Sequence, residues 1–286
     1  MSANGIANSQ IKLKNFTLQD AGPSPVVQNG KLILYTHCLC PYAERAWLAL
    51  LEKEVPFHLV HIDLSSKPSW YRSINPRGLV PAVADIDGTI HVESLDICRW
   101  VDTELAIGRD TIGTSDPSLS PPDAAGKACM NKIISAGSAL SEAGLSFLSG
   151  RNGRYWGIGS GHTDSQRAEF ESALKKAIVD PIQSSNGGPF LMGEQLTLAD
   201  IAVFPFVKRY QVACREFCSG YDVSSVLHGV VGKWLDAMGQ RSAVQITSAS
   251  DELLLKAYKK HSSLDFFDYD SYSATELHPQ NEVYRI

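Results

Sequence analysis

The alternation of apolar and polar segments divides the chain into a first part with strands and helices and a second part with helices alone. Continuous apolar runs at 31–36 and 57–62 are typical of strands that are covered on both faces. A helix that begins at Pro41 separates them, because proline suits the first helical position. Strand, helix and strand within about 30 residues predict a parallel βαβ unit with a right-handed crossover.

The remaining elements of the first part are shorter. In chain order they are a helix at 69–73, strands at 80–84 and 89–92, and a helix at 94–105. Asp87 and Gly88 join the two strands and form a hairpin signal. The order βαβ–ββα predicts a small α/β domain that closes near residue 106.

The second part is predicted to be all-helical, since apolar residues recur there with helical spacing. Helices are expected at about 124–149, 165–184, 198–213, 223–240 and 250–260. Thr197 and Asp200 stand at the start of the third of these helices with the spacing of a capping box, which satisfies N–H groups of the first turn. This feature serves folding rather than chemistry.

The connecting segments complete the expected domain organisation. A stretch rich in Gly, Ser, Pro and Asp separates the two parts and is typical of a linker. In chain order we expect an N-terminal extension at 1–30, the α/β domain at 31–106, the linker at 107–123, the all-helical domain at 124–261 and a C-terminal tail at 262–286.

Composition and charge narrow the classes of function. The 286 residues are 44% hydrophobic and 20% charged, as in ordinary globular proteins, and the net charge of −5 argues against nucleic acid or an acidic membrane as a partner. No apolar run approaches the ~20 residues that span a bilayer. The first 30 residues show neither a secretory signal nor a transit peptide. Six cysteines without a repeated spacing favour a reducing compartment, so the cytoplasm is expected.

Cys40 is the leading candidate for chemistry. It directly precedes Pro41, so it is predicted to lie at the N-cap of a helix, with its sulfur toward free N–H groups and the positive end of the helix dipole. Helix N-termini lower the pKa of a thiol, which favours the reactive thiolate. The alternative is that Cys40 only fills a loop as a small apolar residue, although cysteine is a poor N-cap beside Ser, Thr, Asp or Asn.

The neighbours of Cys40 indicate which thiol chemistry is open to it. A dithiol redox motif would place a second cysteine at position 43, where this chain has alanine, so an external thiol must resolve a mixed disulfide on Cys40. Cys38 is an alternative local resolving thiol, although its bridge to Cys40 would close a strained small ring. A metal site from His37, Cys38 and Cys40 lacks a spaced second pair of ligands, so no metal is expected.

Three further places are candidates for binding a peptide-like ligand. If the Val80–Pro81 bond is cis, the N–H and C=O of Val80 point outward and can pair with an extended peptide; a trans proline that starts a strand is the alternative. The Ser94 hydroxyl and the free N–H groups of its helix suit a carboxylate, and Glu93 suits an ammonium group; a simple N-cap is the alternative. Lys67 is a candidate for a second carboxylate, or else a plain surface lysine.

Together these features describe a thiol tripeptide with a zwitterionic head, a peptide middle and a carboxylate tail, which is the chemistry of glutathione. The sequence resembles the cysteine-type glutathione transferases over roughly residues 30–240. Within them it is most similar to the plant lambda class, followed by the omega class. The segments that carry the resemblance are 31–45, 67–71, 75–76, 79–82, 93–96 and 197–209.

The resemblance implies a thioredoxin-like domain followed by an all-α domain, with Cys40 as the nucleophile. The residues implied to bind glutathione are Lys67, Val80, Pro81, Glu93 and Ser94. Glutathione is implied as a co-substrate, without a metal. The implied partners are small-molecule or protein mixed disulfides, with no nucleic acid and no membrane, and the implied state is a monomer or a homodimer.

The implied activity is glutathione-dependent thiol transfer, including removal of glutathione from mixed disulfides and reduction of dehydroascorbate, with weak conjugation. A cysteine thiolate attacks sulfur, whereas a tyrosine or serine hydroxyl would donate a hydrogen bond to the thiolate of glutathione. Two alternatives use the same fold. One is a non-catalytic carrier of aromatic ligands such as flavonoids, and the other is a redox-regulated, membrane-inserting relative of the intracellular chloride channel type.

Aromatic side chains are candidates for the wall of an acceptor site. Tyr155 and Trp156 lie in a Gly-rich stretch at 150–161, and Tyr210 lies near the end of the predicted helix at 198–213. The alternative for all three is an ordinary core or loop aromatic.

Overall fold

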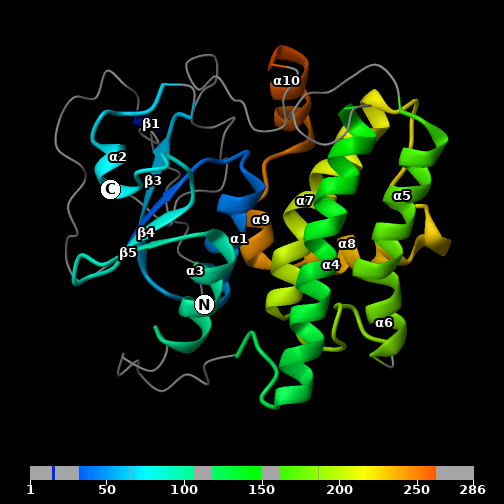
Figure 1. Ribbon diagram of the computed structural model, residues 1–286, viewed down its shortest axis with the longest axis horizontal. Coiled ribbons are helices and arrows are strands. Elements are labelled where there is room, and N and C mark those ends of the chain that lie inside the picture. Colours follow the sequence, from blue (N-terminus) through cyan, green and yellow to red (C-terminus); the bar gives the residue numbers. More distant parts are fainter. Residues whose placement is uncertain are drawn as a thin grey trace, which may run out of the picture.

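A computed structural model describes residues 15–16, 32–64, 66–105, 118–149, 162–185 and 187–261. A sheet with its helices forms one half of the molecule, and a bundle of helices forms the other (Figure 1). This arrangement confirms the predicted fold class, an α/β domain followed by an all-helical domain. Within the described part, no helix combines the length and the apolar character needed to cross a membrane.

The sheet has the strand order β1-β3-β2-β4-β5. The strands are β1 Asn15–Phe16, β2 Leu32–Thr36, β3 Phe57–Ile62, β4 Ala82–Ala84 and β5 Ile90–Val92. β1, β3 and β2 run parallel, and β4 and β5 are antiparallel to their neighbours. The sequence did not predict β1: two residues of the expected extension pair with β3 as an edge strand.

The helices of this half are α1 Pro41–Glu52, α2 Tyr71–Ile74 and α3 Ser94–Thr103. The alternation of side chains along β2 separates two cores. Leu32 and Leu34 belong to a large core that includes residues of α1, α3 and the helical bundle, whereas Ile33 and Tyr35 belong to a smaller core that includes Tyr71 of α2. The sheet is therefore covered on both faces, as its apolar strands predict.

The second half contains helices only, within the residues described. They are α4 Ala124–Ser149, α5 Asp164–Leu174, the π-helical turn η1 Lys175–Val179, α6 Asp180–Ser184, α7 Leu198–Phe217, the 3₁₀ turn η2 Leu227–Gly229, α8 Val230–Gly239, α9 Ser242–Thr247 and α10 Asp251–His261. α9 was not predicted, and α8 begins later than the apolar pattern indicates.

The predicted capping box is present at the start of α7 and has a second task. The Asp200 carboxylate accepts a hydrogen bond from the Thr197 N–H at 3.0 Å, which caps the helix. It also accepts bonds from the Leu191 N–H at 2.8 Å and from Trp234 Nε1 of α8 at 3.0 Å. Asp200 thus ties the start of α7 to two other parts of the bundle.

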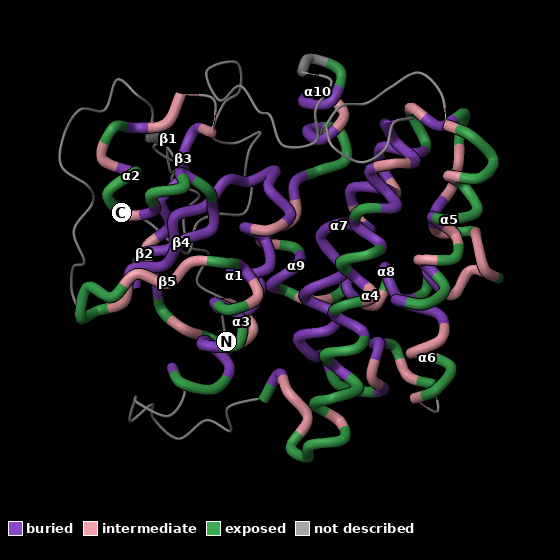
Figure 2. The backbone as a smooth tube through the Cα atoms, viewed as in Figure 1, coloured by how far each residue is buried: buried purple, intermediate pink, exposed green. Residues whose placement is uncertain are grey.

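α1 lies between the sheet and the bundle and is buried along most of its length (Figures 1 and 2). It packs against α3 in its own half and against α7 and α9 of the bundle. The helix that begins next to Cys40 is therefore held by both halves of the molecule, which fixes the position of its first turn.

Candidate active site

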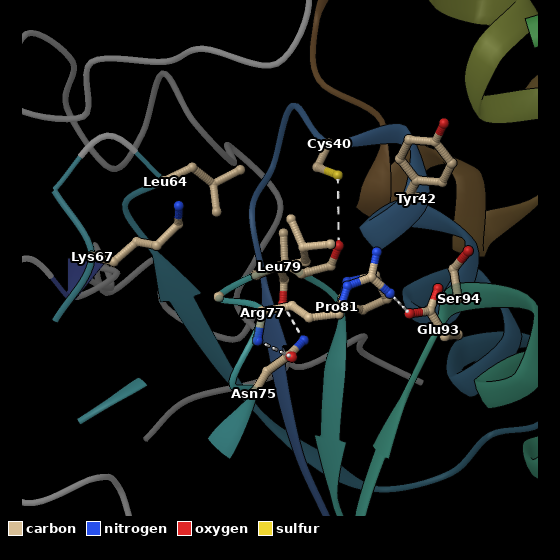
Figure 3. Close-up of a pocket in the computed structure, with 12 residues that line it drawn as sticks. Cys40, Tyr42, Leu64, Lys67, Asn75, Arg77, Leu79, Pro81, Glu93 and Ser94 are labelled. Atoms are coloured by element: carbon tan, nitrogen blue, oxygen red, sulfur yellow. Dashed lines mark hydrogen bonds and ion pairs between the residues drawn. The ribbon is translucent and has the colours of Figure 1, made fainter. Parts of the chain in front are cut away.

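The thiol of Cys40 lies at the start of α1, as the sequence predicted. Cys40 is the N-cap, with φ −77° and ψ 115°, and its side chain makes no capping hydrogen bond. Its Sγ lies 4.0 Å from the carbonyl oxygen of Val80 (Figure 3). Cys40 therefore stands at the positive end of the helix dipole, which favours a thiolate, while its S–H donates to the Val80 carbonyl in the protonated form.

Cys40 opens into a cavity of about 390 Å³. The cavity is lined by Cys40, Tyr42, Leu64, Lys67, Asn75, Arg77, Gly78, Leu79, Val80, Pro81, Glu93 and Ser94. All five residues that the resemblance implied for glutathione are among them. In Figure 3, Lys67 lies on one side of the cavity and the Glu93–Ser94 pair lies on the other, with Cys40 between them.

A tight turn before β4 forms the wall of the cavity next to the Cys40 sulfur. The Val80–Pro81 peptide bond is cis, so the trans alternative is wrong. The Leu79 carbonyl accepts hydrogen bonds from the Tyr71 hydroxyl and from Asn75 Nδ2, both at 2.8 Å. Among the described residues the Val80 N–H has no hydrogen-bond partner. Val80 thus keeps a backbone donor available beside Cys40.

The start of α3 differs from a simple capped helix. Glu93 occupies the N-cap with φ +66° and makes no side-chain capping bond, while Ser94 is the first helical residue. The alternative that Ser94 merely caps the helix is therefore wrong. The carboxylate of Glu93 instead forms an exposed ion pair with Arg77. The N–H groups of the first turn and the Ser94 hydroxyl remain beside the cavity.

Arg77 is a cavity residue that the sequence reasoning missed. It lies in the turn between Asn75 and Val80, and its own N–H donates to Asn75 Oδ1 at 3.1 Å. A lone arginine in a Pro-Arg-Gly turn carries no local pattern of function. The only available signal was its place three residues before Val80.

A buried ion pair supports the loop behind Cys40. Arg209 of α7 donates from Nε to the Leu39 carbonyl at 2.8 Å and from a terminal nitrogen to the Glu44 carboxylate at 2.5 Å. Glu44 also accepts a hydrogen bond from the Ser248 hydroxyl at 3.0 Å. The bundle therefore holds the loop that leads into Cys40.

Cys38 and Cys40 belong to opposite sides of this loop. Cys38 is part of the large core and Cys40 is part of the smaller one, and neither is in a disulfide. A bridge between them would require the loop to turn one side chain out of its core. Cys38 as a resolving thiol stays a prediction.

The acceptor-site candidates do not converge on the cavity. Tyr210 is 1% exposed, and its hydroxyl donates to the Ser141 carbonyl at 2.6 Å within the bundle. The prediction for Tyr210 is therefore wrong, because the ring packs in the helical core instead of lining the cavity. Tyr155 and Trp156 lie outside the described residues. In the described part of the chain, no group of three or more His, Cys, Asp or Glu side chains is placed to hold a metal.

We expect two buried histidines to make the fold sensitive to acid. Burial lowers the pKa of His37 and of His61 to about 3. An unfolded imidazole titrates near ~6.5, so between these values the unfolded chain binds protons that the folded chain does not. The free energy of unfolding should therefore fall as pH decreases from about 6.5 toward 3, by up to about 1.4 kcal/mol per pH unit for each histidine.

Urea unfolding of the wild-type protein and of His61→Asn at several pH values tests this. The variant should lose less stability between about pH 6.5 and pH 5 than the wild type. Equal losses for the two proteins would contradict the prediction.

The protein has a thioredoxin-like domain, which places a cysteine at a helix start, and an all-helical domain after it. This combination defines the class of two-domain thiol proteins with a glutathione transferase fold. Two family models agree with this class. The model for the glutathione S-transferase N-terminal domain matches residues 39–104, and that for the C-terminal domain matches residues 155–247. The chain belongs to the glutathione S-transferase family.

Individual relatives refine the similarity. The chain is 29% identical to glutathione S-transferase L1 of Arabidopsis thaliana, over 87% of this chain and 95% of that protein. It is 26% identical to glutathione S-transferase DHAR2 of the same species, over 77% of this chain and 89% of that protein. The resemblance to the lambda class is thereby confirmed.

Solved structures agree with the fold. The omega-class transferase 3C of Trametes versicolor superposes with a TM-score of 0.59 at 25% identity, covering 79% of this chain and 90% of that chain. A trimeric glutathione transferase of Leishmania, TDR1, superposes with a TM-score of 0.66 at 25% identity, covering 82% of this chain and 47% of that chain. Proteins of this family use glutathione as a substrate.

Proposed function

We propose that this protein is a glutathione-dependent thiol transferase in which Cys40 is the nucleophile. The observation that carries the proposal is the position of Cys40 at the uncapped start of α1, where its side chain lines the cavity. A sulfur in this position is favoured as thiolate, and a thiolate attacks sulfur. No hydroxyl is needed for this chemistry.

Glutathione would lie across the cavity with its cysteine beside Cys40. Its backbone would pair with Val80, next to Pro81, as an added strand does at a sheet edge. The γ-glutamyl ammonium group would meet Glu93, its carboxylate would meet Ser94 and the N-terminus of α3, and the glycine carboxylate would meet Lys67. The placement of Lys67 opposite the Glu93–Ser94 pair supports this orientation.

The reaction has two exchange steps. The Cys40 thiolate attacks the glutathione sulfur of a mixed disulfide, forms a Cys40–glutathione disulfide and releases the substrate as its thiolate. A second glutathione thiolate attacks the glutathione sulfur of this disulfide, which regenerates Cys40 and releases oxidised glutathione. Because position 43 is alanine, the second cysteine of a dithiol motif is absent and does not compete with the second glutathione. The substrates would be small-molecule or protein mixed disulfides, and also dehydroascorbate, which the similarity to DHAR2 supports.

The test is to identify the covalent intermediate. The protein is treated with oxidised glutathione, and peptide mass mapping locates the adduct. We expect it on Cys40 and expect reduced glutathione to remove it. Cys129 is an exposed thiol on α4 outside this cavity, so Cys129→Ser is the matched control and should form the same adduct. A protein that carries glutathione only on Cys129, while binding aromatic ligands tightly, would instead be the non-catalytic carrier.

Arg77 is expected to affect glutathione binding through Glu93. In the ion pair, Arg77 holds the carboxylate that the ligand ammonium group needs, and both side chains are more than half exposed. Arg77→Ala removes this competition but also removes a positive charge near the ligand carboxylate. Since exposed pairs contribute at most about 1 kcal/mol, the KM for glutathione should change by less than about fivefold.

Glu93→Gln is the matched comparison for Arg77→Ala. It removes the carboxylate that would pair with the γ-glutamyl ammonium group of glutathione. The KM for glutathione should therefore rise by about tenfold or more, as expected for a lost charged hydrogen bond. Steady-state kinetics over a range of glutathione concentrations measures both variants. An Arg77→Ala effect as large as that of Glu93→Gln would contradict this prediction.

Two further expectations stay predictions. The chain is expected to be a monomer or a homodimer. The cytoplasmic location is also a prediction, because a relative from Arabidopsis thaliana, glutathione S-transferase L2, is named as chloroplastic.

A further inference from the structure

Arg45 connects the helical bundle to the edge of the cavity. It lies on α1 five residues after Cys40 and is 4% exposed. Its Nε donates to the Ala202 carbonyl of α7 at 2.8 Å, and a terminal nitrogen donates to Ser94 Oγ at 3.4 Å. The guanidinium carbon also lies 4.6 Å from the centre of the Phe206 ring. One buried side chain thus reaches from the bundle to Ser94.

Within the described residues, the charge of Arg45 has no acidic partner. None of the carboxylates in the described part of the chain forms an ion pair with it, in contrast to Arg209, which pairs with Glu44. Burial lowers the pKa of the Arg45 guanidinium below its ordinary value. A buried cation that is compensated only by dipoles and by the rings of Tyr42 and Phe206 destabilises a fold, so its place beside the cavity favours an anion there.

The hydrogen bond from Arg45 also determines whether the Ser94 hydroxyl can donate a hydrogen bond into the cavity. A guanidinium has donors only, so Ser94 Oγ must be the acceptor in this bond. The hydroxyl proton is then left for another acceptor, and no residue that the structure describes accepts it. Ser94 lines the cavity. Its proton is therefore available for an anion in the cavity, next to the N–H groups at the start of α3.

We infer that Arg45 is a positioning residue that orients the Ser94 hydroxyl as a donor and places a positive charge behind it, so that this end of the cavity selects the γ-glutamyl carboxylate of glutathione. This inference rests on the proposed function for the identity of the ligand. It adds a residue outside the cavity lining and makes α7, through Ala202, part of the binding apparatus.

The experiment compares glutathione with an analogue in which hydrogen replaces the γ-glutamyl α-carboxylate. Calorimetric titration of the wild-type protein should show binding of glutathione about tenfold or more tighter than of the analogue, as expected for a hydrogen bond to a charged group. Arg45→Lys keeps the charge but cannot reach Ala202 and Ser94 together. It should bind glutathione about tenfold more weakly and bind the analogue as the wild type does.

Two further variants distinguish the orienting effect of Arg45 on Ser94 from a general disturbance of the structure. Ser94→Ala should lose the same discrimination, and adding Arg45→Lys to it should cost little more, because the two residues act as one unit. Arg241→Lys changes another arginine at the junction of the two halves, where it pairs with Glu52 outside the cavity. It should keep the wild-type preference for glutathione.

Each outcome decides between the two proposals. If Arg45→Lys weakens glutathione and the analogue equally, or leaves both unchanged, the inference is overturned. If the wild-type protein does not distinguish the two ligands, the inference also fails, although Cys40 can still form its adduct. Arg45→Lys can lose the preference for glutathione over the analogue while the wild-type protein forms no adduct on Cys40. In that case the proposed catalysis fails and the role of Arg45 stands.

Discussion

Cys40→Ser should lose glutathione-dependent reduction of hydroxyethyl disulfide by at least about a thousandfold, as expected when a nucleophile is removed. The serine hydroxyl is not ionised at neutral pH and does not attack sulfur. The change replaces one buried small side chain by another of similar size, so the fold should persist.

The same substitution should act in the opposite direction on conjugation. A serine hydroxyl at the start of α1 can donate a hydrogen bond to the thiolate of glutathione, which a cysteine thiolate cannot do. Cys40→Ser should therefore keep or increase the rate of conjugation with a chlorodinitrobenzene-type electrophile. Loss of disulfide reduction together with a kept or increased rate of conjugation, in one preparation, cannot arise from misfolding.

Cys38→Ala and Cys129→Ser are the controls for this experiment. Cys38 lies two residues from Cys40 but in the other core, and Cys129 is an exposed thiol on α4. Both variants should keep disulfide reduction near the wild-type rate. Retained reduction in Cys40→Ser, or its loss in Cys38→Ala, would assign the chemistry to a different thiol.

Arg209→Met should lower the free energy of unfolding by about 3–5 kcal/mol, because it leaves the Glu44 carboxylate buried without its cation. Both side chains of the pair are at most 3% exposed. Arg209 also donates to the carbonyls of Cys38, Leu39 and Pro205, so four acceptors lose a donor. The loss is a large share of the about 5–15 kcal/mol that stabilises a typical protein.

The double variant Glu44→Gln with Arg209→Met is the matched comparison. Removing both charges avoids the stranded carboxylate, so most of the lost stability should return. The midpoint of urea unfolding measures each protein. Thiol transfer should fall in Arg209→Met even where the protein is folded, since the Leu39 carbonyl next to Cys40 is released. A single variant as stable as the wild type would mean that the pair does not hold the loop.

Local sequence patterns predicted the elements that depend on neighbouring residues. The apolar runs placed β2 and β3, and the bounds of α4 match the predicted 124–149. Pro41 marked the start of α1, which put Cys40 at the N-cap. These predictions succeed because strand pleat, helix period and helix capping are decided within a few residues.

Other features had no local signal. The two-residue strand β1 is too short for any alternation to show, and it exists only because β3 offers an edge. Tyr210 looked like a candidate for the acceptor wall, but its neighbours Ser141 and Gly144 come from α4 and enclose it in the bundle. Burial of this kind depends on which helices pack together.

The sequence by itself determined that a thiol stands at a helix start, that position 43 lacks the cysteine of a dithiol motif, and that polar groups suited to glutathione follow at the next strand and helix ends. Only the tertiary structure decided that these groups surround one cavity and that Arg45, Arg77 and Arg209 support it. The bonds of Arg45 join residues 49 and 157 positions apart. Contacts at such separations are made by the packing of α1 between sheet and bundle, which no local pattern of the chain records.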